Sequence, residues 1–302
     1  YMNGTCEADS AFSLCGQCVI RVFLFIGSSG RLMSRLLSQK QFETRCPSEL
    51  DIVIHATVDS TNSWLLQQVK AGSALPRACF AEQQTQGRGR RGKQWLMPPY
   101  SNIAMSLAWR FSGGDLQLHL LPVAIALAIV DTLEFVGVRQ VQIKWPNDVY
   151  VHGQKIAGIL IETVARGGDL VVVIGVGLNY DMSGAMSSSG LQDLPAFTDV
   201  CSEVTTAVGR DVLAAELLAR VIEACEVFSQ QAYAGLERFS RDYDFCRDKT
   251  VEIQSDNNKT VCGIARGVNH LGELVVEIDG GLQTFNSAQV SVKPRPSPEY
   301  DP

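Results

Sequence analysis

A loop of glycines and cationic residues carries the clearest chemical signal in the chain. Between Gln84 and Trp95 the sequence reads QTQGRGRRGKQW, and residues 88–93 include three arginines and one lysine. Glycine lets the backbone approach a ligand closely and adopt positive φ, and arginine forks match carboxylate and phosphate oxygens. Because cations packed this closely repel one another, the pattern predicts a loop that binds an anionic ligand.

Three other interpretations of this loop compete with anion binding. Gly87, Gly89 and Gly92 fit the G-x-G-x-x-G pattern of dinucleotide sites, but the spacers there are usually small, and Pro98-Pro99 prevents a long helix. An arginine-rich RNA-binding loop predicts further basic clusters, which a chain of net charge −6 and pI near 5.3 does not supply. A simple solvated charged loop is the third alternative. We favour the anion-binding loop of an active site.

Four further polar segments follow in a fixed order around this loop. They are residues 59–62 (DSTN), 144–148 (KWPND), 155–162 (KIAGILIE) and 175–179 (GVGLN). Together with the loop, they resemble the biotin–protein ligases over about residues 51–293. A lipoate or octanoyl ligase of the same architecture is the nearest rival, and the arginine pattern of the loop favours the biotin branch. A biotin-sensing transcriptional repressor is the second alternative, and it would need a DNA-binding domain.

The resemblance implies a two-step reaction. Biotin's carboxylate attacks the α-phosphate of ATP, supplied with Mg²⁺, to give biotinyl-adenylate, and a lysine of a carrier protein then takes the biotinyl group. The implied acceptor is the biotin carboxyl-carrier protein of acetyl-CoA carboxylase. No covalent enzyme intermediate is required, so the catalytic work consists of positioning two anions and stabilising charge at the α-phosphate.

Site residues follow from the same resemblance. It gives catalytic roles to Lys155, Arg88 and Asp148, with Asp148 orienting the acceptor lysine or helping to hold Mg²⁺. The implied biotin site comprises Ser60, Thr61, Asn62, Gln84, Arg88, Gly89, Arg90, Lys155 and Gly158. The implied ATP site comprises Gly87, Arg88, Arg90, Arg91, Gly92, Trp95, Asn147 and Asn179.

Each of these residue types also has a purely structural interpretation. Ser60 or Thr61 alone would be expected to cap the helix that follows. Trp95 alone would be a core residue, and Lys155 alone a surface lysine on a strand. Asn147 and Asp148, as an isolated pattern, would more often form a turn.

The elements that must position these residues indicate an α+β fold, with a central mixed β-sheet flanked by helices, similar to class II synthetases. Strands are predicted at 52–54, 78–82, 103–109, 141–145, 155–164 and 170–176, and helices after residue 62 and at 120–135 and 212–228. After Arg247 the pattern changes to short strands at 251–253, 261–266, 273–278 and 289–292, separated by Asn, Gly and Asp turns. That change predicts a small C-terminal β-barrel.

These elements divide the chain into four parts. Residues 1–46 are expected to be irregular, with one short helix over 32–42. Residues 47–246 form the biotin- and ATP-binding domain, 247–294 the barrel, and 295–302 a frayed tail. A DNA-binding module needs about 60 residues with three helices, so residues 1–46, with a net charge of only +2 from five Lys and Arg against three acids, predict no operator binding.

Composition indicates a globular protein, and the scattered cysteines and lack of a signal-peptide or membrane-spanning pattern favour the cytoplasm. Hydrophobic residues make up 46% and charged residues 19% of the chain, which excludes long disorder. The nine cysteines are scattered, so we interpret them as unpaired thiols, with a metal or redox role for Cys15 and Cys18 disfavoured. The apolar run at 18–26 is too short to cross a bilayer. Members of the family often pair through an edge of the central sheet, so the resemblance leaves a homodimer open, and composition does not decide the oligomeric state.

Overall fold

A mixed β-sheet forms the centre of the molecule in the computed structural model, which describes residues 36–111, 117–166, 169–183, 196–255, 260–287 and 290–294. Its strand order is β1-β2-β3-β7-β6-β5-β4. The pair β1–β2 is parallel, and the other neighbours are antiparallel. The strands are β1 (Asp51–His55), β2 (Arg77–Ala81), β3 (Asn102–Phe111), β4 (Val141–Lys144), β5 (Asp148–Val151), β6 (Gln154–Arg166) and β7 (Asp169–Asn179). The predicted mixed sheet is confirmed.

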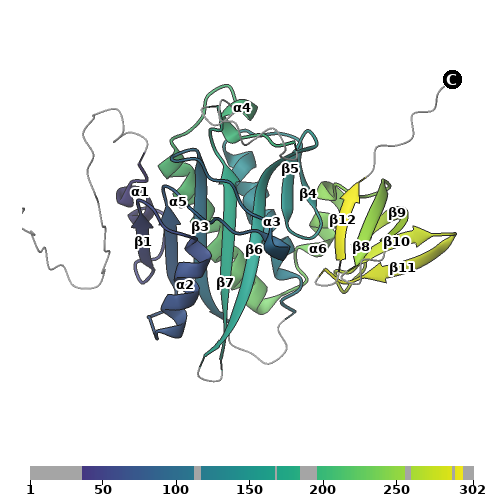
Figure 1. Cartoon of the computed structure of the whole chain (residues 1–302), viewed down its shortest axis with the longest axis horizontal. Helices are drawn as coiled ribbons and strands as arrows, with labels where there is room; N and C mark the ends of the chain where they lie inside the picture. Colours follow the sequence, from purple (N-terminus) through teal and green to yellow (C-terminus); the bar gives the residue numbers. More distant parts are fainter. Residues whose placement is uncertain are drawn as a thin grey trace, which may run out of the picture.

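Helices cover both faces of this sheet (Figure 1). The long helices α3 (Leu121–Phe135) and α5 (Arg210–Gln230) pack together on one face and bury the main core. Helix α2 (Thr61–Lys70) packs on the other face over a smaller cluster that includes Cys79 and Val173. Because alternate side chains of a strand point to opposite faces, Phe80 belongs to the first core while its neighbour Cys79 belongs to the second.

The segment before β1 is part of the main core. Helix α1 (Gln39–Glu43) buries Phe42, which is 1% exposed, and Leu37 lies in the same cluster. The sequence predicts an irregular segment up to residue 46, with a helix over 32–42. The described helix begins later, at Gln39, and residues 1–35 lie outside the described part of the chain.

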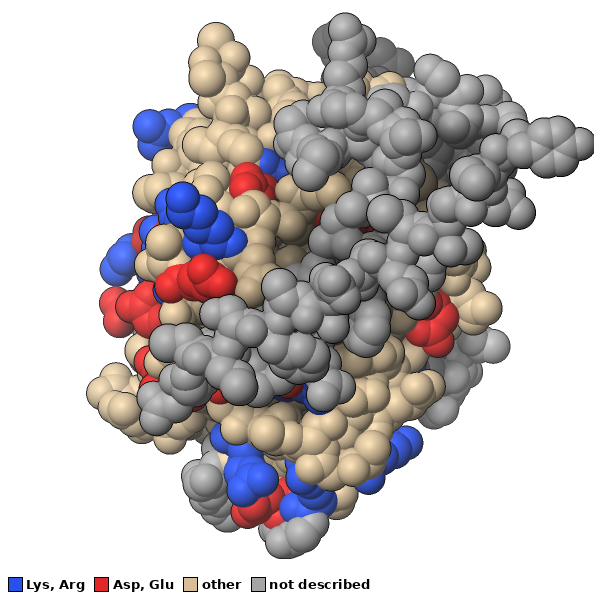
Figure 2. All heavy atoms as spheres, turned by 90° about the vertical axis from the view of Figure 1, so that its left-hand side faces the viewer, with Lys and Arg blue, Asp and Glu red and all other residues tan. Residues whose placement is uncertain are grey.

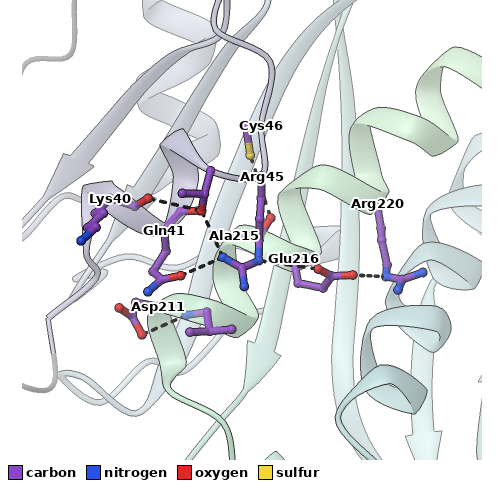
Figure 3. Close-up of polar contacts among 10 residues, drawn as sticks. Lys40, Gln41, Arg45, Cys46, Asp211, Ala215, Glu216 and Arg220 are labelled. Carbon is purple, nitrogen blue, oxygen red and sulfur yellow. Dashed lines mark hydrogen bonds and ion pairs between the residues drawn. The ribbon is translucent and has the colours of Figure 1, made fainter.

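Polar side chains fix α1 against α5 (Figure 3). Glu216 lies between two arginines, accepting a 2.7 Å hydrogen bond from Arg220 Nε and pairing with Arg45 Nε at 3.9 Å. Arg45 also donates to Gln41 Oε1 at 2.8 Å. The neighbouring Cys46 is half-buried, and burial raises the pKa of its thiol to about 11, so it is neutral at physiological pH. It is one of the free cysteines of the described chain, whereas Cys15 and Cys18 lie outside the described residues.

The C-terminal part forms a separate antiparallel sheet of order β11-β10-β9-β8-β12. Its strands are β8 (Thr250–Ser255), β9 (Thr260–Val268), β10 (Leu274–Ile278), β11 (Gly281–Phe285) and β12 (Val290–Pro294). The sequence predicts a barrel here. The described pairings instead give an open order, in which no pairing joins β11 to β12. Strand β11 (GLQTF) was not predicted because it is short, almost wholly exposed, and follows directly on the hairpin turn at Asp279 and Gly280, both with positive φ.

One turn of the C-terminal sheet docks against the central sheet. Trp145 Nε1 donates to the carbonyl of Gly272 at 3.1 Å, and His119 Nε2 lies 2.7 Å from the carbonyl of Leu271. Gly272 has a φ of +75°, which favours glycine, and a Cβ there would lie 2.0 Å from a Leu120 methyl and displace it. The short helices α4 (Val200–Glu203), α6 (Leu236–Arg238) and η3 (Phe239–Tyr243) complete the described elements outside the cationic loop.

The surface beside β1 carries charges of both signs. Figure 2 shows Lys and Arg side chains interspersed with Asp and Glu over the described part of this face. An RNA-binding surface would require a continuous basic patch, so this face does not favour that alternative. In the described residues, no helix is both long and apolar enough to cross a membrane.

Candidate active site

A cavity opens on the α2 side of the central sheet, between the start of α2, the cationic loop and strands β6 and β7. It encloses about 60 Å³. Predicted site residues dominate its lining: Ser60, Thr61, Asn62, Gln84, Arg88, Gly89, Arg90, Trp95, Asn147, Asp148, Lys155 and Gly158. Residues far apart in the sequence therefore meet at one place, as the five polar segments predicted.

One end of the cavity is neutral, polar and buried. Thr61 donates from both its backbone N and its hydroxyl to Gln84 Oε1, at 2.9 and 3.1 Å, and it accepts a 2.7 Å bond from Ser106. Ser60 caps α2, because its hydroxyl accepts from Ser63 N at 3.5 Å. Ser60 therefore both caps α2 and lines the cavity. Ser60, Thr61 and Ser106 are at most 4% exposed.

Asn62 is held on both sides of its amide. Its Nδ2 donates to Glu162 Oε2 at 3.0 Å and to the Leu160 carbonyl at 3.3 Å, and its Oδ1 shares the single hydroxyl hydrogen of Ser106 with Thr61. A Cβ on Gly175 would lie 2.2 Å from Asn62 Oδ1. The glycine in β7 therefore makes room for this amide, which a larger residue would displace.

The cationic loop is a tight hairpin. Trp95 N donates to Gly87 O at 2.9 Å and Gly89 N donates to Lys93 O at 2.7 Å, with a one-turn 3₁₀ helix, η2 (Arg90–Gly92), at the tip. Arg91 and Gly92 have positive φ. A dinucleotide site would place a helix after its first glycine, so this hairpin argues against that alternative.

The two inward-facing arginines of this loop make different contacts. Arg88 forms a bidentate pair with Glu162, at 2.7 and 3.1 Å, and also donates to Ser63. Arg90 donates to Asn147 Oδ1 at 2.7 Å and to the carbonyl of Ser287, at 2.6 Å, in the C-terminal sheet unit. Burial, followed by repulsion from neighbouring Arg91, lowers the pKa of Arg90. Such a group gains from a nearby anion.

Trp95 lies over two glycines of the sheet. A Cβ on Gly177 would come within 2.4 Å of the indole ring, and one on Gly158 within 3.2 Å. Gly158 and Gly177 are paired across β6 and β7, so they form one flat patch under the ring. The buried Nε1 of Trp95 meets no acceptor among the described residues, and an unpaired buried donor favours a ligand acceptor.

The other end of the cavity centres on Lys155. Its Nζ donates to Asp148 Oδ1 at 2.7 Å and lies 5.5 Å from the centre of the Trp95 ring. Asn147 Nδ2 also donates to Asp148 Oδ1, at 3.1 Å. Asp148 is therefore fixed by two donors, and the lysine stands between the indole and the carboxylate.

A second lysine adds to the positive charge of this end. Lys144 lies directly across β4 and β5 from Asp148, with its Nζ 5.6 Å from the centre of the Tyr150 ring. Burial lowers the pKa of Lys144, Asp148 opposes that shift, and Lys155 and Lys93 reinforce it. Lys144 thus lies within the field of the charged groups of this end.

Some predicted residues lie away from the cavity wall, and some lining residues were not predicted. Gly87, Arg91, Gly92 and Asn179 do not line it; the Asn179 amide instead donates to the carbonyls of Thr198 and Lys155. Gly87 has a structural reason, because a Cβ there would lie 2.3 Å from Trp95 O. Lining residues that were not predicted are Ala104, Met105, Ile159, Leu160, Gly175, Val176 and Gly177.

Of two missed polar contacts, one carries a usable signal in the sequence. Ser106 stands alone in the apolar strand sequence IAMSLAW, and Glu162 closes the segment KIAGILIE. A polar residue inside a buried strand needs a partner. That rule could have pointed to Ser106, whereas the partner of Glu162 depends on how the loop folds.

The cavity can bind a ligand that has a hydrogen-bonding group at one end and an anion at the other. Its neutral end offers Thr61 and Gln84, and its charged end offers arginine and lysine donors around Asp148.

Comparison with known proteins gives a consistent result. The model of the biotin/lipoate A/B protein ligase family matches residues 54–179, and that of the biotin protein ligase C-terminal domain matches residues 248–293. The chain is 32% identical over 247 residues to the bifunctional ligase/repressor BirA of Escherichia coli, covering 80% of this chain and 74% of that protein.

Two further similarities extend this result. The biotin–[acetyl-CoA-carboxylase] ligase of Paracoccus denitrificans is 32% identical over 249 residues, covering 78% of this chain and 98% of that protein. The biotin protein ligase of Aquifex aeolicus, solved in complex with biotin and ATP, has a TM-score of 0.68 at 20% identity. The match covers 81% of this chain and 99% of the Aquifex chain, so the two proteins share the same fold.

Proposed function

Because the chain belongs to the biotin protein ligase family, we propose that it couples biotin to ATP and passes biotin to a carboxylase carrier domain. In the first step a biotin carboxylate oxygen bonds to the α-phosphorus of ATP. The bond from that phosphorus to the bridging oxygen breaks, and pyrophosphate leaves. In the second step the ε-amine of an acceptor lysine bonds to the acyl carbon, AMP leaves, and the amine proton passes to solvent.

The observation that carries this proposal is the division of the cavity into a neutral and a cationic end. Biotin has the matching chemistry, with a neutral hydrogen-bonding ring system at one end and a carboxylate at the other. Thr61, Ser60 and Gln84 would bind the ring, with Asn62 beside them. Arg88, Gly89 and Gly158 would border the carboxylate and the chain that carries it.

Lys155 would do most to accelerate the first step. Its ammonium, between Trp95 and Asp148, can neutralise the carboxylate and stabilise charge that develops on the α-phosphate. A fixed cation needs no reorganisation at the moment of reaction, which is the main source of such catalysis. Arg90 and Asn147 would hold the phosphates, and Trp95 would cover the nucleotide, with Gly87, Arg91, Gly92 and Asn179 supporting that site.

Magnesium would arrive as part of the ATP substrate. In the described residues no three His, Cys, Asp or Glu side chains come together as a metal site. Mg²⁺ is commonly bound by one or two carboxylates plus substrate phosphates and water, and Asp148 can supply one carboxylate. In the second step the same carboxylate, fixed by Lys155 and Asn147, would orient the acceptor amine.

Other expectations complete the proposal. We propose that the acceptor is the biotin carboxyl-carrier protein of acetyl-CoA carboxylase and that the protein works in the cytoplasm. A homodimer through a sheet edge and the lack of operator binding stay predictions. Sedimentation with and without biotin and ATP tests the first, and a gel-shift assay of the full chain with operator DNA tests the second.

The proposed chemistry is tested by biotin-dependent exchange of labelled pyrophosphate into ATP. The wild-type chain should show exchange, and Lys155→Ala and Arg88→Ala should each lower it at least about tenfold, since each removes a preorganised cation. Addition of an apo carrier domain should then yield one biotinylated lysine by mass spectrometry. A folded sample that gives no exchange with biotin would contradict the proposal.

A further inference from the structure

Glu162 holds together the two parts of the cavity that the proposed reaction requires. Its Oε1 accepts from Arg88 Nη2 at 2.7 Å, and its Oε2 accepts from Arg88 Nη1 at 3.1 Å and from Asn62 Nδ2 at 3.0 Å. Arg88 belongs to the cationic loop, and Asn62 belongs to the first turn of α2 beside the neutral end. One carboxylate therefore joins both ends.

The position of Glu162 on β6 places it beside the cavity. Side chains at alternate positions of a strand share a face, so Glu162 lies on the same face of β6 as Gly158 and Leu160, which line the cavity. The Ile159 and Ile161 side chains belong to the main core or pack against it. The Glu162 side chain is 23% exposed. A half-buried carboxylate with three donors differs from an exposed ion pair, which contributes little.

The contacts of Arg88 leave one edge of its guanidinium for a ligand. Glu162 takes the edge formed by Nη1 and Nη2, and Ser63 accepts the other hydrogen of Nη1. Among the described residues no acceptor meets Nε or the second hydrogen of Nη2. Those two N–H groups form the other edge of the fork, which fits a carboxylate or phosphate bidentately. The Glu162 pair and a bound anion can thus occupy Arg88 together.

We propose that Glu162 is a positioning residue, which aims Arg88 at the carboxylate of the bound acid and ties it to α2. This inference rests on the proposed biotin and ATP sites. Glu162 does not touch the reacting atoms; it acts through Arg88. Loss of its charge should therefore weaken binding of the acid more than it slows the chemical step or weakens ATP binding.

The test compares Glu162→Gln with a matched variant, Asp131→Asn. Asp131 forms a similar two-bond pair with Arg238, at comparable exposure, outside the cavity. Pyrophosphate exchange would give kcat and KM for biotin and for ATP. We expect Glu162→Gln to raise the biotin KM about tenfold, with kcat and the ATP KM within about threefold of wild type. Asp131→Asn should change none of them.

A double-mutant cycle separates positioning from folding. In the Arg88→Ala background, Glu162→Gln should add less than about twofold to the biotin KM, because the group it positions is gone. Glu162→Asp, which keeps the charge but reaches less far, should lie between wild type and Glu162→Gln. Thermal melting of each variant gives the accompanying change in stability.

Other results would contradict either the positioning role of Glu162 or the proposed function. An unchanged biotin KM in Glu162→Gln, or an equal effect with and without Arg88, overturns the positioning role alone. A fall in kcat and a rise in both KM values, in parallel with a lower melting temperature, shows a structural role instead. Absence of biotin-dependent exchange in the folded wild-type chain overturns the proposed function, and the role of Glu162 with it.

Discussion

The two ends of the cavity differ in how they are built. At the neutral end the side chains are uncharged and fixed by hydrogen bonds to one another, as Thr61, Gln84 and Ser106 show, and Thr61 and Ser106 are buried. At the cationic end the side chains are long, partly exposed and charged, with Arg88 42% and Lys155 28% exposed.

This difference separates selection from catalysis. Buried polar groups discriminate strongly, because a ligand that lacks the matching group leaves them unpaired. Fixed charges act on any anion of suitable shape, and they lower a barrier where charge develops. We therefore expect changes at the neutral end to alter which acid binds, and loss of the Lys155 charge at the cationic end to alter how fast the bound acid reacts.

The largest effect is expected from Lys155→Ala. Adenylate formation in a single turnover should slow by about 10²–10³-fold, the usual cost of removing one preorganised charge-stabilising group. Binding of biotinamide, which lacks the carboxylate, should change less than about twofold by calorimetry. Lys249→Ala is the matched control, because Lys249 also lies over an aromatic ring, at 3.7 Å from the centre of Phe245, but outside the cavity. Equal losses in both variants would contradict the role of Lys155.

Gln84→Ala, at the neutral end of the cavity, should have the next largest effect, a rise in the biotin KM. It leaves the backbone N and hydroxyl of Thr61 without their acceptor, a loss of about 1–3 kcal/mol. The biotin KM should rise about 10–100-fold while kcat stays within about threefold. Gln68→Ala removes a glutamine that likewise accepts two bonds, from Ser73 and Arg77, away from the cavity. A fall in kcat in Gln84→Ala would contradict the expectation that the neutral end affects binding of the acid and not the rate of its reaction.

Added salt should weaken ATP binding at the cationic end by a few-fold more than it weakens binding at the neutral end. Between about 0.05 and 0.5 M KCl the screening length shortens to a few ångströms, so the ATP KM should rise several-fold. Binding of uncharged biotinamide should stay within about twofold over the same range. A parallel change in both would show that the neutral end depends on charge.

The smallest effect concerns pH. Because burial lowers the pKa of Lys144, its proton should be lost below the range of an ordinary lysine, near 10.4. Positive charge near the phosphates falls as the pH rises through that lower range, so the ATP KM should rise a few-fold there. Lys144→Met should already have the higher ATP KM at neutral pH and show no such rise. An equally steep rise in Lys144→Met would assign the titration to another group.

The sequence predicted the central sheet and most of the cavity because the informative residues are local. Gly87, Gly89 and the arginines between and after them lie in one loop, and the Ser60–Asn62 cap lies in one turn. Such patterns depend on neighbouring residues, whose contacts follow from the order of the chain.

The contacts that were missed depend on strand register. Gly158 faces Gly177, and Ser106 faces Gly175, only because β3, β7 and β6 pair in that alignment. The space for Trp95 and Asn62 is therefore a property of paired strands. In the same way, β11 depends on β10 for its pairing, since its own residues are largely exposed.

The central claim is that the neutral end selects biotin and the cationic end activates it. The most direct measurement is pyrophosphate exchange by the purified wild-type chain with biotin, lipoate and octanoate, each at saturating concentration. The account predicts exchange with biotin and at most about one-hundredth of that rate with the other two acids, because neither matches the donors and acceptors around Thr61 and Gln84. Comparable exchange with lipoate or octanoate would contradict the claim.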